Sequence, residues 1–363
     1  MIHAVIMAGG AGTRFWPESR ADFPKQLLTL TGNRSMIQST VDRIASLIPQ
    51  DRTLIVTGQR LVDKMREQLP SLPGQSIIGE PCRRDTAPCI GLAALLCAAE
   101  DAEAIMVVMP ADHVIEQDDK FCDAIQNAAD LVEENARRIV TFGIRPTYPA
   151  ETFGYIERGE PLATKADREE NASAYRVKQF REKPKADVAQ QYLQSGDFYW
   201  NSGIFVWKAA TILDELQLRE PEMMGHLRTI AESWGNDNFD EMFSKEFAAI
   251  RGVSIDYAVM EHAEDIVVIE APFDWDDVGN WSAVGRLRGS DENGNTIVGK
   301  HLGIGTTNSI VRAEDGHLLV TLGVENMILV QTRDATLVAN RNDEESIRQL
   351  VKMIEEKGWN EYL

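Results

Sequence analysis

Short apolar runs alternate with longer helical patterns through the first 150 residues of the chain. Runs at 2–7, 54–57, 105–109 and 139–142 predict buried strands, because few polar residues interrupt them. Stretches at 35–48, 86–99 and 118–138 predict helices. Strands that alternate with helices are typical of an α/β fold with a mixed, mainly parallel sheet, here of Rossmann-like order. Ligands of such sheets collect at the carboxyl ends of the strands.

The pattern changes twice further along the chain. Between 151 and 270 it becomes mixed, with β segments at 174–180 and 203–207 among helices, which predicts a second lobe on the same sheet. Beyond 289, short β runs at 296–298, 309–312, 318–322, 327–331 and 336–338 follow one another without helices, and one helix ends the chain. We therefore expect a domain at 1–289 that contains the lobe at 151–270. A β-rich module would follow at 290–363, with a left-handed β-helix as one possible form.

Composition narrows the class of partner. The chain has 363 residues, of which 44% are hydrophobic, and its 57 acidic against 37 basic residues give a formal net charge of −20. This charge opposes binding to nucleic acid or to an anionic membrane, so we expect neither as a partner. No run approaches the roughly 20 apolar residues of a membrane helix, and the start is unlike a signal peptide, which predicts a cytoplasmic protein. The four cysteines lack paired zinc spacing and are expected to pack in the core.

A glycine-rich loop follows the first predicted strand. Gly9, Gly10 and Gly12 let backbone N–H groups approach an oxyanion, although a tight turn would use glycines too. The loop fits neither the Walker A motif nor the dinucleotide fingerprint. Arg14 and Lys25 strengthen the case for phosphate, because a guanidinium can hold two phosphate oxygens while an ammonium supplies a point charge.

Acidic and polar motifs downstream supply further candidates. Asp112 follows a buried strand, and DWDDVGNW at 274–281 is a second acidic cluster, so carboxylates from the two segments could share one Mg²⁺ ion, although Asp112 alone suits a cap or turn. Glu182 and Lys183 are adjacent in FREKP, where an extended chain would point them to opposite faces, and an exposed charged turn is the alternative. Asn201 lies in WNSGIF, which suits either hydrogen bonds to sugar hydroxyls or a plain β-turn.

These motifs together resemble the sugar-phosphate nucleotidyltransferases, whose signature is G-G-x-G-x-R followed by P-K. The form GGAGTRFWPESR…PKQLL is similar to the mannose-1-phosphate guanylyltransferase branch, and the matching motifs extend over residues 3–281. The resemblance implies an enzyme that transfers GMP from GTP to α-mannose 1-phosphate, with Mg²⁺, giving GDP-mannose and pyrophosphate. The alternatives are a glucose-1-phosphate enzyme that uses UTP or dTTP, and a subunit that binds nucleotide sugars without turnover.

The resemblance also implies roles for individual residues. Arg14 and Lys25 would be catalytic, and Asp112 and Asp277 would bind the metal. The nucleotide would be bound by Ala8, Gly9, Gly10, Gly12, Thr13, Arg84 and Thr86, and the sugar phosphate by Gly154, Glu182, Lys183, Asn201 and Asp256.

Several features leave alternatives open. Two segments depart from the family pattern: Asp85 replaces an asparagine, and ETFGYI has Phe153 and lacks the earlier glycine of the family form T-G-Y-G-Y-I. Asp85 or Thr86 could instead cap the following helix, as could Asp256 for its own helix. The last 75 or so residues are too short for the isomerase domain of bifunctional relatives, so we expect them to pack on the catalytic body or to support a homodimer.

Overall fold

The computed structural model describes residues 1–10, 12–162 and 174–363, which form two compact units. The first unit consists of Met1–Ala8, Asp42–Ala111 and Ile115–Trp275. The second consists of Gly9–Val41, Asp112–Val114 and Asp276–Leu363. Each unit therefore combines three segments that are separated in the sequence. The domain boundary at 289 stays a prediction.

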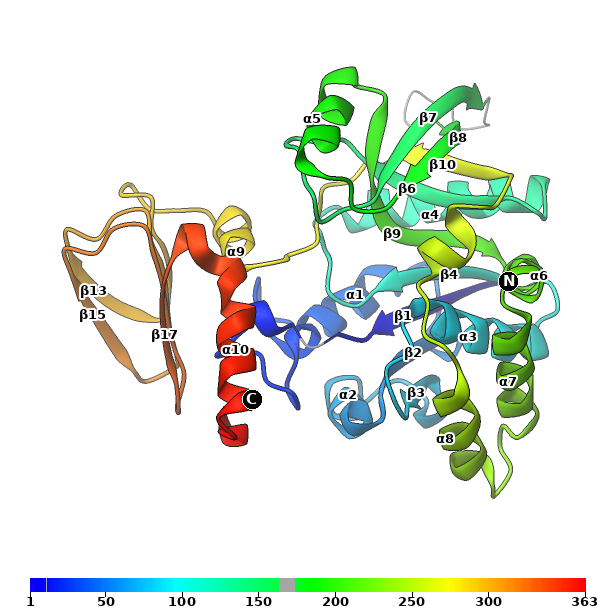
Figure 1. Cartoon of the computed structure of the whole chain (residues 1–363), viewed down its shortest axis with the longest axis horizontal. Helices are drawn as coiled ribbons and strands as arrows, with labels where there is room; N and C mark the ends of the chain where they lie inside the picture. Colours follow the sequence, from blue (N-terminus) through cyan, green and yellow to red (C-terminus); the bar gives the residue numbers. More distant parts are fainter. Residues whose placement is uncertain (11, 163–173) are drawn as a thin grey trace. The chain divides into compact units, whose positions relative to one another are not determined.

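The first unit is built on a nine-stranded sheet with the order β3-β2-β1-β4-β9-β6-β10-β8-β7 (Figure 1). Its strands are β1 (Ile2–Ala8), β2 (Thr53–Gly58), β3 (Ile77–Glu80), β4 (Ile105–Pro110), β6 (Ile139–Ile144), β7 (Tyr155–Leu162), β8 (Ala174–Arg181), β9 (Phe198–Lys208) and β10 (Ile266–Glu270). β1 pairs in parallel with β2 and β4, β2 with β3, and β6 with β10, whereas β9 is antiparallel to both β4 and β6. The prediction of a mixed, mainly parallel sheet is confirmed, and β1, β2, β3, β4, β6 and β10 all end at one edge.

Helices cover both sides of this sheet, with α3 and α4 on opposite sides of the strands in Figure 1. In chain order the helices up to residue 249 are α1 (Met36–Ile44), α2 (Val62–Gln68), α3 (Thr86–Glu100), α4 (Asp118–Glu134), α5 (Ala186–Ser195), α6 (Ala209–Arg219), α7 (Pro221–Glu232) and α8 (Phe239–Ala249). α3 consists largely of alanine and leucine and packs against α6 and α7. A Cβ atom on its Gly91 would lie 2.7 Å from Leu227, so the helices need this glycine to approach. None of the described helices is both long and apolar enough to cross a membrane.

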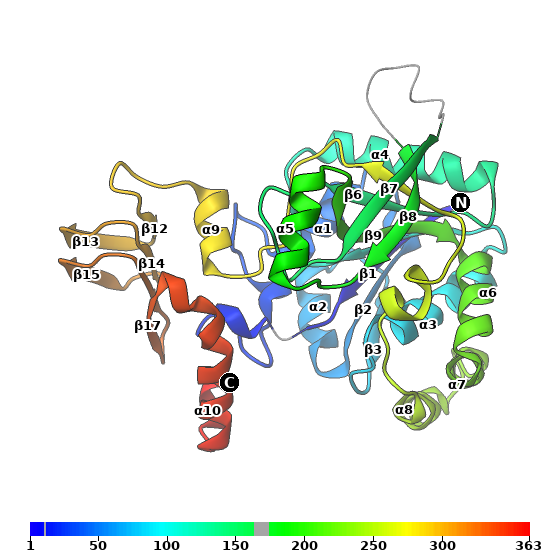
Figure 2. The ribbon, with the colours of Figure 1, turned by 45° about the horizontal axis from the view of Figure 1, so that its top comes forward.

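The second unit contains a stack of short strands (Figure 2). β12 (Thr296–Val298), β14 (Ile310–Ala313) and β16 (Met327–Gln331) pair in parallel, as do β13 (Lys300–Ile304) and β15 (Leu318–Leu322), and β17 (Thr336–Asn340) closes the stack antiparallel to β16. Asparagines stack between successive turns: the Nδ2 of Asn308 donates to Oδ1 of Asn326 at 3.0 Å, and Nδ2 of Asn326 donates to Oδ1 of Asn340 at 3.2 Å. Such repeating rungs confirm the predicted β-rich, β-helix-like module.

The end of the chain packs on the segment that follows the glycine loop, within the second unit. The ring of Phe15 lies edge-on against Trp281 of α9 (Trp281–Arg288), with centroids 5.2 Å apart. Trp16 donates from Nε1 to the carbonyl of Tyr362 at 2.8 Å, and α10 (Ile347–Glu356) contacts the turn that holds Phe15. One part of the predicted catalytic region thus shares a core with the last residues of the chain.

Candidate functional site

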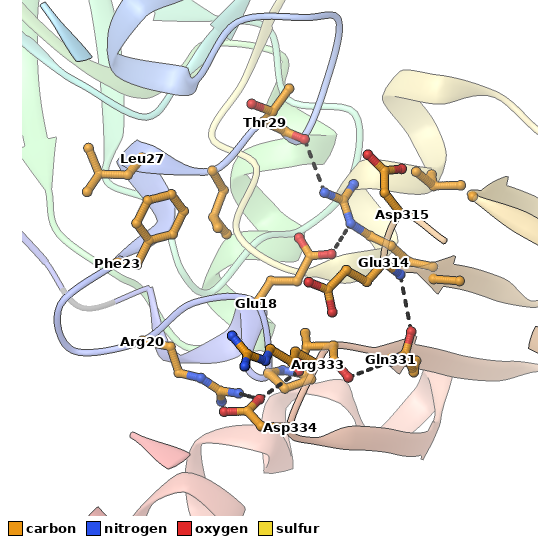
Figure 3. A pocket seen from close by; sticks show the side chains of 17 residues that line it. Glu18, Arg20, Phe23, Leu27, Thr29, Glu314, Asp315, Gln331, Arg333 and Asp334 are labelled. Carbon is orange, nitrogen blue, oxygen red and sulfur yellow. Dashed lines mark hydrogen bonds and ion pairs between the residues drawn. The ribbon is translucent and has the colours of Figure 1, made fainter. Parts of the chain in front are cut away.

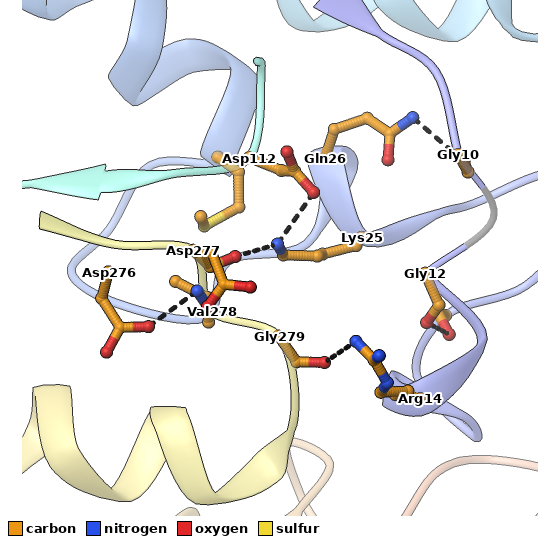
Figure 4. Close-up of polar contacts among 12 residues, drawn as sticks. Gly10, Gly12, Arg14, Lys25, Gln26, Asp112, Asp276, Asp277, Val278 and Gly279 are labelled. Atoms are coloured by element: carbon orange, nitrogen blue, oxygen red, sulfur yellow. Dashed lines mark hydrogen bonds and ion pairs between the residues drawn. The ribbon is translucent and has the colours of Figure 1, made fainter. Parts of the chain in front are cut away.

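Lys25 lies at the centre of a buried polar cluster in the second unit, shown in Figure 4. Its ammonium donates to Oδ2 of Asp112 at 2.8 Å and to the carbonyl of Asp277 at 2.6 Å, and only 8% of its side chain is exposed. Pro24 directly precedes the single 3-10 turn, Lys25–Leu27, that directs this side chain inward. Two aspartates from distant parts of the sequence therefore meet at one lysine. We refer to Arg14, Lys25, Asp112 and Asp277 as the lysine–aspartate cluster.

Burial and neighbouring charges act in opposite directions on the two carboxylates. Burial raises the pKa of Asp277, and the negative charges of Asp276 and Asp112 add to this rise against the opposing charges of Lys25 and Arg14. Burial also acts to raise the pKa of Asp112, but the Lys25 ammonium holds that pKa below its ordinary value. A divalent cation would offset the repulsion between these carboxylates.

The donor set suits a hard divalent cation. In the described part of the chain no group of three or more His, Cys, Asp or Glu side chains converges on a metal position. Mg²⁺ does not need such a group, because one or two carboxylates commonly hold it together with water and substrate phosphates. Asp112 and Asp277 therefore fit Mg²⁺ on the nature of their donors.

Arg14 lies in the 3-10 turn that follows the glycine loop and joins the same cluster. Its Nη1 donates to the carbonyl of Gly279 at 2.9 Å, and its Nε pairs with Glu345 at 3.0 Å. A Cβ on Gly279 would lie 3.0 Å from Oδ2 of Asp277 and 3.5 Å from Nη1 of Arg14, so glycine lets both side chains approach this segment. The Arg14 guanidinium is thus held at Gly279, two residues along the chain from the candidate metal ligand Asp277.

The neighbouring aspartates have structural partners instead. Asp276 accepts a hydrogen bond from the backbone N–H of Val278 at 2.7 Å and pairs with Arg286 at 2.9 Å. Asp274 accepts from Nε2 of Gln117 at 3.1 Å. Of the three aspartates in DWDDVGNW, Asp277 is therefore the one that lies beside Lys25, as expected of the predicted metal ligand.

The glycine loop needs glycine at two of its positions. Gly12 has φ +57°, and a Cβ there would lie 2.5 Å from Cβ and 2.9 Å from the backbone nitrogen of Lys25. Gly10 has φ +92°, again in the region that favours glycine. Gln26 donates from Nε2 to the carbonyls of Gly9 and Gly10 at 3.2 and 3.4 Å, a contact that no sequence motif predicted. The glycine loop therefore contacts the Lys25–Leu27 turn at Gly9 and Gly10 and approaches it closely at Gly12.

The remaining residues of the predicted loop site have defined positions. Ala8 ends β1, and its carbonyl accepts a hydrogen bond from the hydroxyl of Thr57 at 3.0 Å. Thr13 begins the 3-10 turn Thr13–Phe15 that carries Arg14. Ala11, between Gly10 and Gly12, lies outside the described residues.

The residues predicted to bind the sugar phosphate come together in the first unit. A Cβ on Gly154 would lie 2.6 Å from Oε2 of Glu182 and 3.4 Å from Cβ of Asn201. The backbone N–H of Asn201 donates to Gly154 at 2.8 Å, and its Nδ2 donates to Oδ1 of Asp256 at 3.2 Å. We refer to Gly154, Glu182, Lys183, Asn201 and Asp256 as the sugar cluster. Because Asn201 lies within β9, the alternative of a plain β-turn is wrong.

Glu182 and Lys183 differ from the expectation of opposite faces. Lys183 has φ +44°, and this turn brings its ammonium to 2.5 Å from Oε1 of Glu182. The Glu182 side chain is 10% exposed and that of Lys183 is 60% exposed. The strand ends at Arg181, so the alternation of faces no longer applies to the next two residues.

Asp256 is a buried acid that pairs across the sugar cluster. Burial, together with the charge of Glu182, raises its pKa to about 7. It begins a π-helical turn, Asp256–Met260, whose N-cap is Ile255 and which has no side-chain cap. The alternative that Asp256 caps this helix is therefore wrong, and its carboxylate accepts from Asn201 instead.

Arg84 and Thr86 hold a neighbouring segment in place. Arg84 donates from Nη2 to the carbonyl of Ala248 at 2.6 Å, and the hydroxyl of Thr86 accepts from the N–H of Ile255 at 2.9 Å. Asp85, at φ +67°, is the N-cap of α3 and accepts from the N–H of Thr86, so the capping alternative is confirmed for Asp85. The nucleotide role of Arg84 and Thr86 stays a prediction.

The second departure from the family pattern, Phe153, belongs to an aromatic cluster. Its ring packs edge-on against Trp200, at 5.0 Å between centroids, and against Trp275, at 5.5 Å. The Phe153 ring is thus held by aromatic packing, directly before Gly154 of the sugar cluster.

Glu80 lies at the carboxyl end of β3, and no role was predicted for it from the sequence. It is the last residue of β3, and its Oε1 is buried without a hydrogen-bond partner among the described residues. Burial raises its pKa to about 8. The available signal was a carboxylate at the start of EPCRRDTAP, shortly after the apolar residues Ile77 and Ile78.

A separate cavity of about 490 Å³ lies in the second unit, and charged side chains that line it pair with one another (Figure 3). Arg20 pairs there with Asp334 at 2.6 Å, and Arg312 pairs with Glu18. None of the four residues of the lysine–aspartate cluster lines it. We therefore do not assign the chemistry to this cavity.

Comparisons with known proteins identify the family of the chain. The nucleotidyl transferase family model matches residues 3–292, and a model of the MannoseP isomerase/GMP-like beta-helix domain matches residues 299–354. Mannose-1-phosphate guanylyltransferases of Salmonella montevideo and Escherichia coli K12 are 41% and 38% identical to this chain. These alignments cover 100% and 99% of this chain and 76% and 75% of the relatives.

A crystal structure from Thermus thermophilus, named mannose-1-phosphate geranyltransferase, has a TM-score of 0.85 and 32% identity, and the match covers 98% of this chain and 99% of that one. The chain belongs to the nucleotidyl transferase family, in the branch of the mannose-1-phosphate guanylyltransferases.

Proposed function

We propose that this chain transfers GMP from GTP to α-mannose 1-phosphate and releases GDP-mannose and pyrophosphate. The observation that carries the proposal is that Lys25 contacts both the Asp112 carboxylate and the backbone carbonyl of Asp277, with Arg14 held at the nearby Gly279. The curated relatives that match nearly the whole chain are named mannose-1-phosphate guanylyltransferases, which supports the choice of substrates.

The reaction requires charge neutralisation more than proton transfer. A phosphate oxygen of the sugar phosphate attacks the α-phosphorus of GTP, the bond to the β-phosphate oxygen breaks, and its electron pair leaves with pyrophosphate. The second pKa of a phosphate monoester is near 6, so the attacking group is already mainly a dianion at neutral pH. The reaction therefore needs no general base, and positioning and electrostatics dominate.

Each cluster has a defined task in this proposal. Residues 8–10, 12 and 13 and Arg14 would hold the triphosphate, and Lys25 would stabilise the charge that develops on the departing pyrophosphate. Asp112 and Asp277 would hold Mg²⁺, which neutralises charge on the α-phosphate when it is bound.

The sugar cluster would bind the other reactant. Lys183 would hold the phosphate of mannose 1-phosphate. Glu182, Asn201 and Asp256 would bind sugar hydroxyls, and Gly154 would leave space for the ring. Arg84 and Thr86 would position the nucleotide through the segment they hold.

A pyrophosphate-release assay tests this function directly. The four ribonucleoside triphosphates and dTTP are each combined with mannose 1-phosphate and with glucose 1-phosphate, with and without magnesium. We expect strong magnesium-dependent turnover with GTP and mannose 1-phosphate. Turnover with UTP or dTTP and glucose 1-phosphate alone would support the first alternative enzyme. Binding of GDP-mannose without any turnover would support a binding subunit.

We further propose that the protein forms a homodimer through the outer face of β13 and β15. Five apolar side chains on this face are more than half exposed: Leu302, Ile304, Leu318, Val320 and Leu322. The parallel register sets Leu302 beside Val320 and Ile304 beside Leu322, so the face is continuous and on the order of 500 Å², near the upper end for a monomer. Light scattering should show a dimer that Val320→Lys with Leu322→Lys converts to a monomer, whereas Thr336→Lys does not. A monomeric wild type would refute this proposal.

We also propose that the protein acts in the cytoplasm. All four cysteines are free thiols, and three of them are buried. Unpaired cysteines are typical of proteins from reducing compartments. Fractionation of cells that express the native protein would test the location, and recovery outside the cytoplasmic fraction would contradict it.

A further inference from the structure

The start of the last long helix, α10, lies beside the turn that carries Arg14. Within the second unit α10 contacts the 3-10 turn Thr13–Phe15. Ile347, the first residue of α10, is 1% exposed and belongs to the same apolar core as Phe15. This shared core anchors the beginning of the helix at the Arg14 turn, so polar side chains of its first turn can reach the same ligand as Arg14.

Arg348 is the cationic side chain of this first turn. The 3-10 turn Arg341–Ser346 continues directly into α10, and residues three apart in such turns lie on the same side. Glu345, which pairs with Arg14 at 3.0 Å, therefore has Arg348 as a neighbour. Burial and the positive charge of Arg14 lower the pKa of Arg348, while the charge of Glu345 opposes this shift. One carboxylate thus lies near two guanidinium groups.

Both guanidinium groups keep N–H donors that the protein does not use. Arg14 donates from Nη1 to Gly279 (Figure 4) and from Nε to Glu345, and its Nη2 has no hydrogen-bond partner among the described residues. Arg348 is exposed and makes no hydrogen bond or ion pair with any residue that the structure describes. A guanidinium with free donors can hold two phosphate oxygens at once. The two neighbouring arginines therefore suit an anion with several phosphate oxygens.

The charges around Arg14 and Lys25 leave a need for a further cation. Three carboxyl groups lie next to these two cations: Asp112 and Asp277 beside Lys25, and Glu345 beside Arg14. A nucleoside triphosphate adds several negative charges to this set. Catalysis of phosphoryl transfer depends on fixed positive charge where negative charge develops. A cation with no partner of its own, close to Arg14, meets this need.

We propose that Arg348 binds the β- and γ-phosphates of GTP beside Arg14, and hence the pyrophosphate that leaves. This inference rests on the function proposed above and adds a residue of the C-terminal helix to the site. The charges that act on Arg348 are those of Arg14 and Glu345, and neither Asp112 nor Asp277 is among them. Arg348 therefore lies at the Arg14 end of the site, away from the metal candidates that would act on the α-phosphate.

The reverse reaction tests this assignment, because it uses pyrophosphate as a substrate. GDP-mannose and pyrophosphate are converted to GTP and mannose 1-phosphate by wild-type enzyme and by Arg348→Met. We expect the KM for pyrophosphate to rise ~10-fold or more in the variant, as for the loss of a charge-assisted hydrogen bond, and the KM for GTP in the forward reaction to rise similarly. The KM values for GDP-mannose and mannose 1-phosphate should stay constant, because neither contains the β- and γ-phosphates of GTP.

Two further variants and the wild type separate the possible failures. Arg348→Lys keeps the charge and should raise the KM for pyrophosphate less than Arg348→Met does. Lys352→Met changes an exposed lysine of the same helix and should behave as the wild type. A wild type without turnover in either direction would refute the proposed function itself. An active wild type would refute the role of Arg348 alone if Arg348→Met left the KM for pyrophosphate unchanged, or raised all four KM values equally.

Discussion

The lysine–aspartate cluster and the sugar cluster hold their cationic side chains in different ways. In the first, both cations are fixed before any ligand binds: Lys25 is 8% exposed with two partners, and Arg14 is held by Gly279 and Glu345. In the second, the one lysine is 60% exposed and has turned onto Glu182, while Asp256 remains buried beside Asn201. The first arrangement suits a charge that develops during the reaction, because it needs little reorganisation. The second suits a ligand that is mostly neutral hydroxyls with one phosphate.

This difference predicts that the loss of Lys25 lowers activity more than the loss of any other residue in the two clusters. Lys25→Met removes the ammonium from the centre of the cluster and leaves the Asp112 carboxylate without its ion pair. We expect kcat for pyrophosphate release to fall by roughly 10³-fold, in the range found for removal of a preorganised donor. Lys120→Met, at an exposed position on α4, is the matched control and should retain normal activity. A tenfold loss or less would show that the cluster does not act on the transition state.

The two proposed metal ligands should have the next largest effect, and a specific one. Asp112→Asn and Asp277→Asn each remove one anionic donor for a hard cation. We expect activity at a fixed, low magnesium concentration to fall by about 100-fold, with partial recovery as magnesium is raised. Asp274→Asn, whose carboxylate accepts from Gln117, is the control. A magnesium dependence equal to that of the wild type in both variants would contradict the assignment.

Loss of the exposed lysine should be milder and confined to one substrate. Lys183→Met removes a charge-assisted hydrogen bond, of about 1.5–3 kcal/mol, to the sugar phosphate. The KM for mannose 1-phosphate should therefore rise by roughly 10- to 100-fold while the KM for GTP stays constant. Lys185→Met changes an exposed lysine two residues away and serves as the control. Equal changes in both KM values would mean that the clusters do not divide the substrates.

The smallest effect concerns stability and pH. Because the pKa of Asp256 is raised to about 7 in the folded protein, the protonated side chain stabilises the fold, and this contribution is lost as the pH rises through 7. Relative to Asp256→Asn, the wild type should lose about 1.4 kcal/mol of unfolding free energy between pH 6 and pH 8. Urea denaturation at the two pH values measures this difference. The same pH dependence in both proteins would show that Asp256 does not titrate in this range.

Much of the fold followed from local pattern, because apolar runs and glycine loops act over a few residues. The strand at 2–7 and the helix at 86–99 were predicted within a residue or two, and Asp112 was correctly placed beyond its strand. The predictions that failed depend on contacts or backbone turns that one segment does not contain. Lys183 bends onto Glu182 through its positive φ, and Glu80 becomes notable only when its neighbours prove to offer no donor. Segments 9–41 and 276–363 form one unit, which no local pattern predicts.

The central claim is that Asp112 and Asp277 share one divalent ion that acts on the phosphate of the nucleotide. Crystals grown with Mn²⁺ in place of Mg²⁺ and with GDP-mannose would test it through the anomalous signal of manganese. The account predicts one strong peak at about 2.1–2.2 Å from a carboxylate oxygen of each aspartate and in contact with a phosphate oxygen of the ligand. A peak bound elsewhere, or one that contacts neither aspartate, would contradict it.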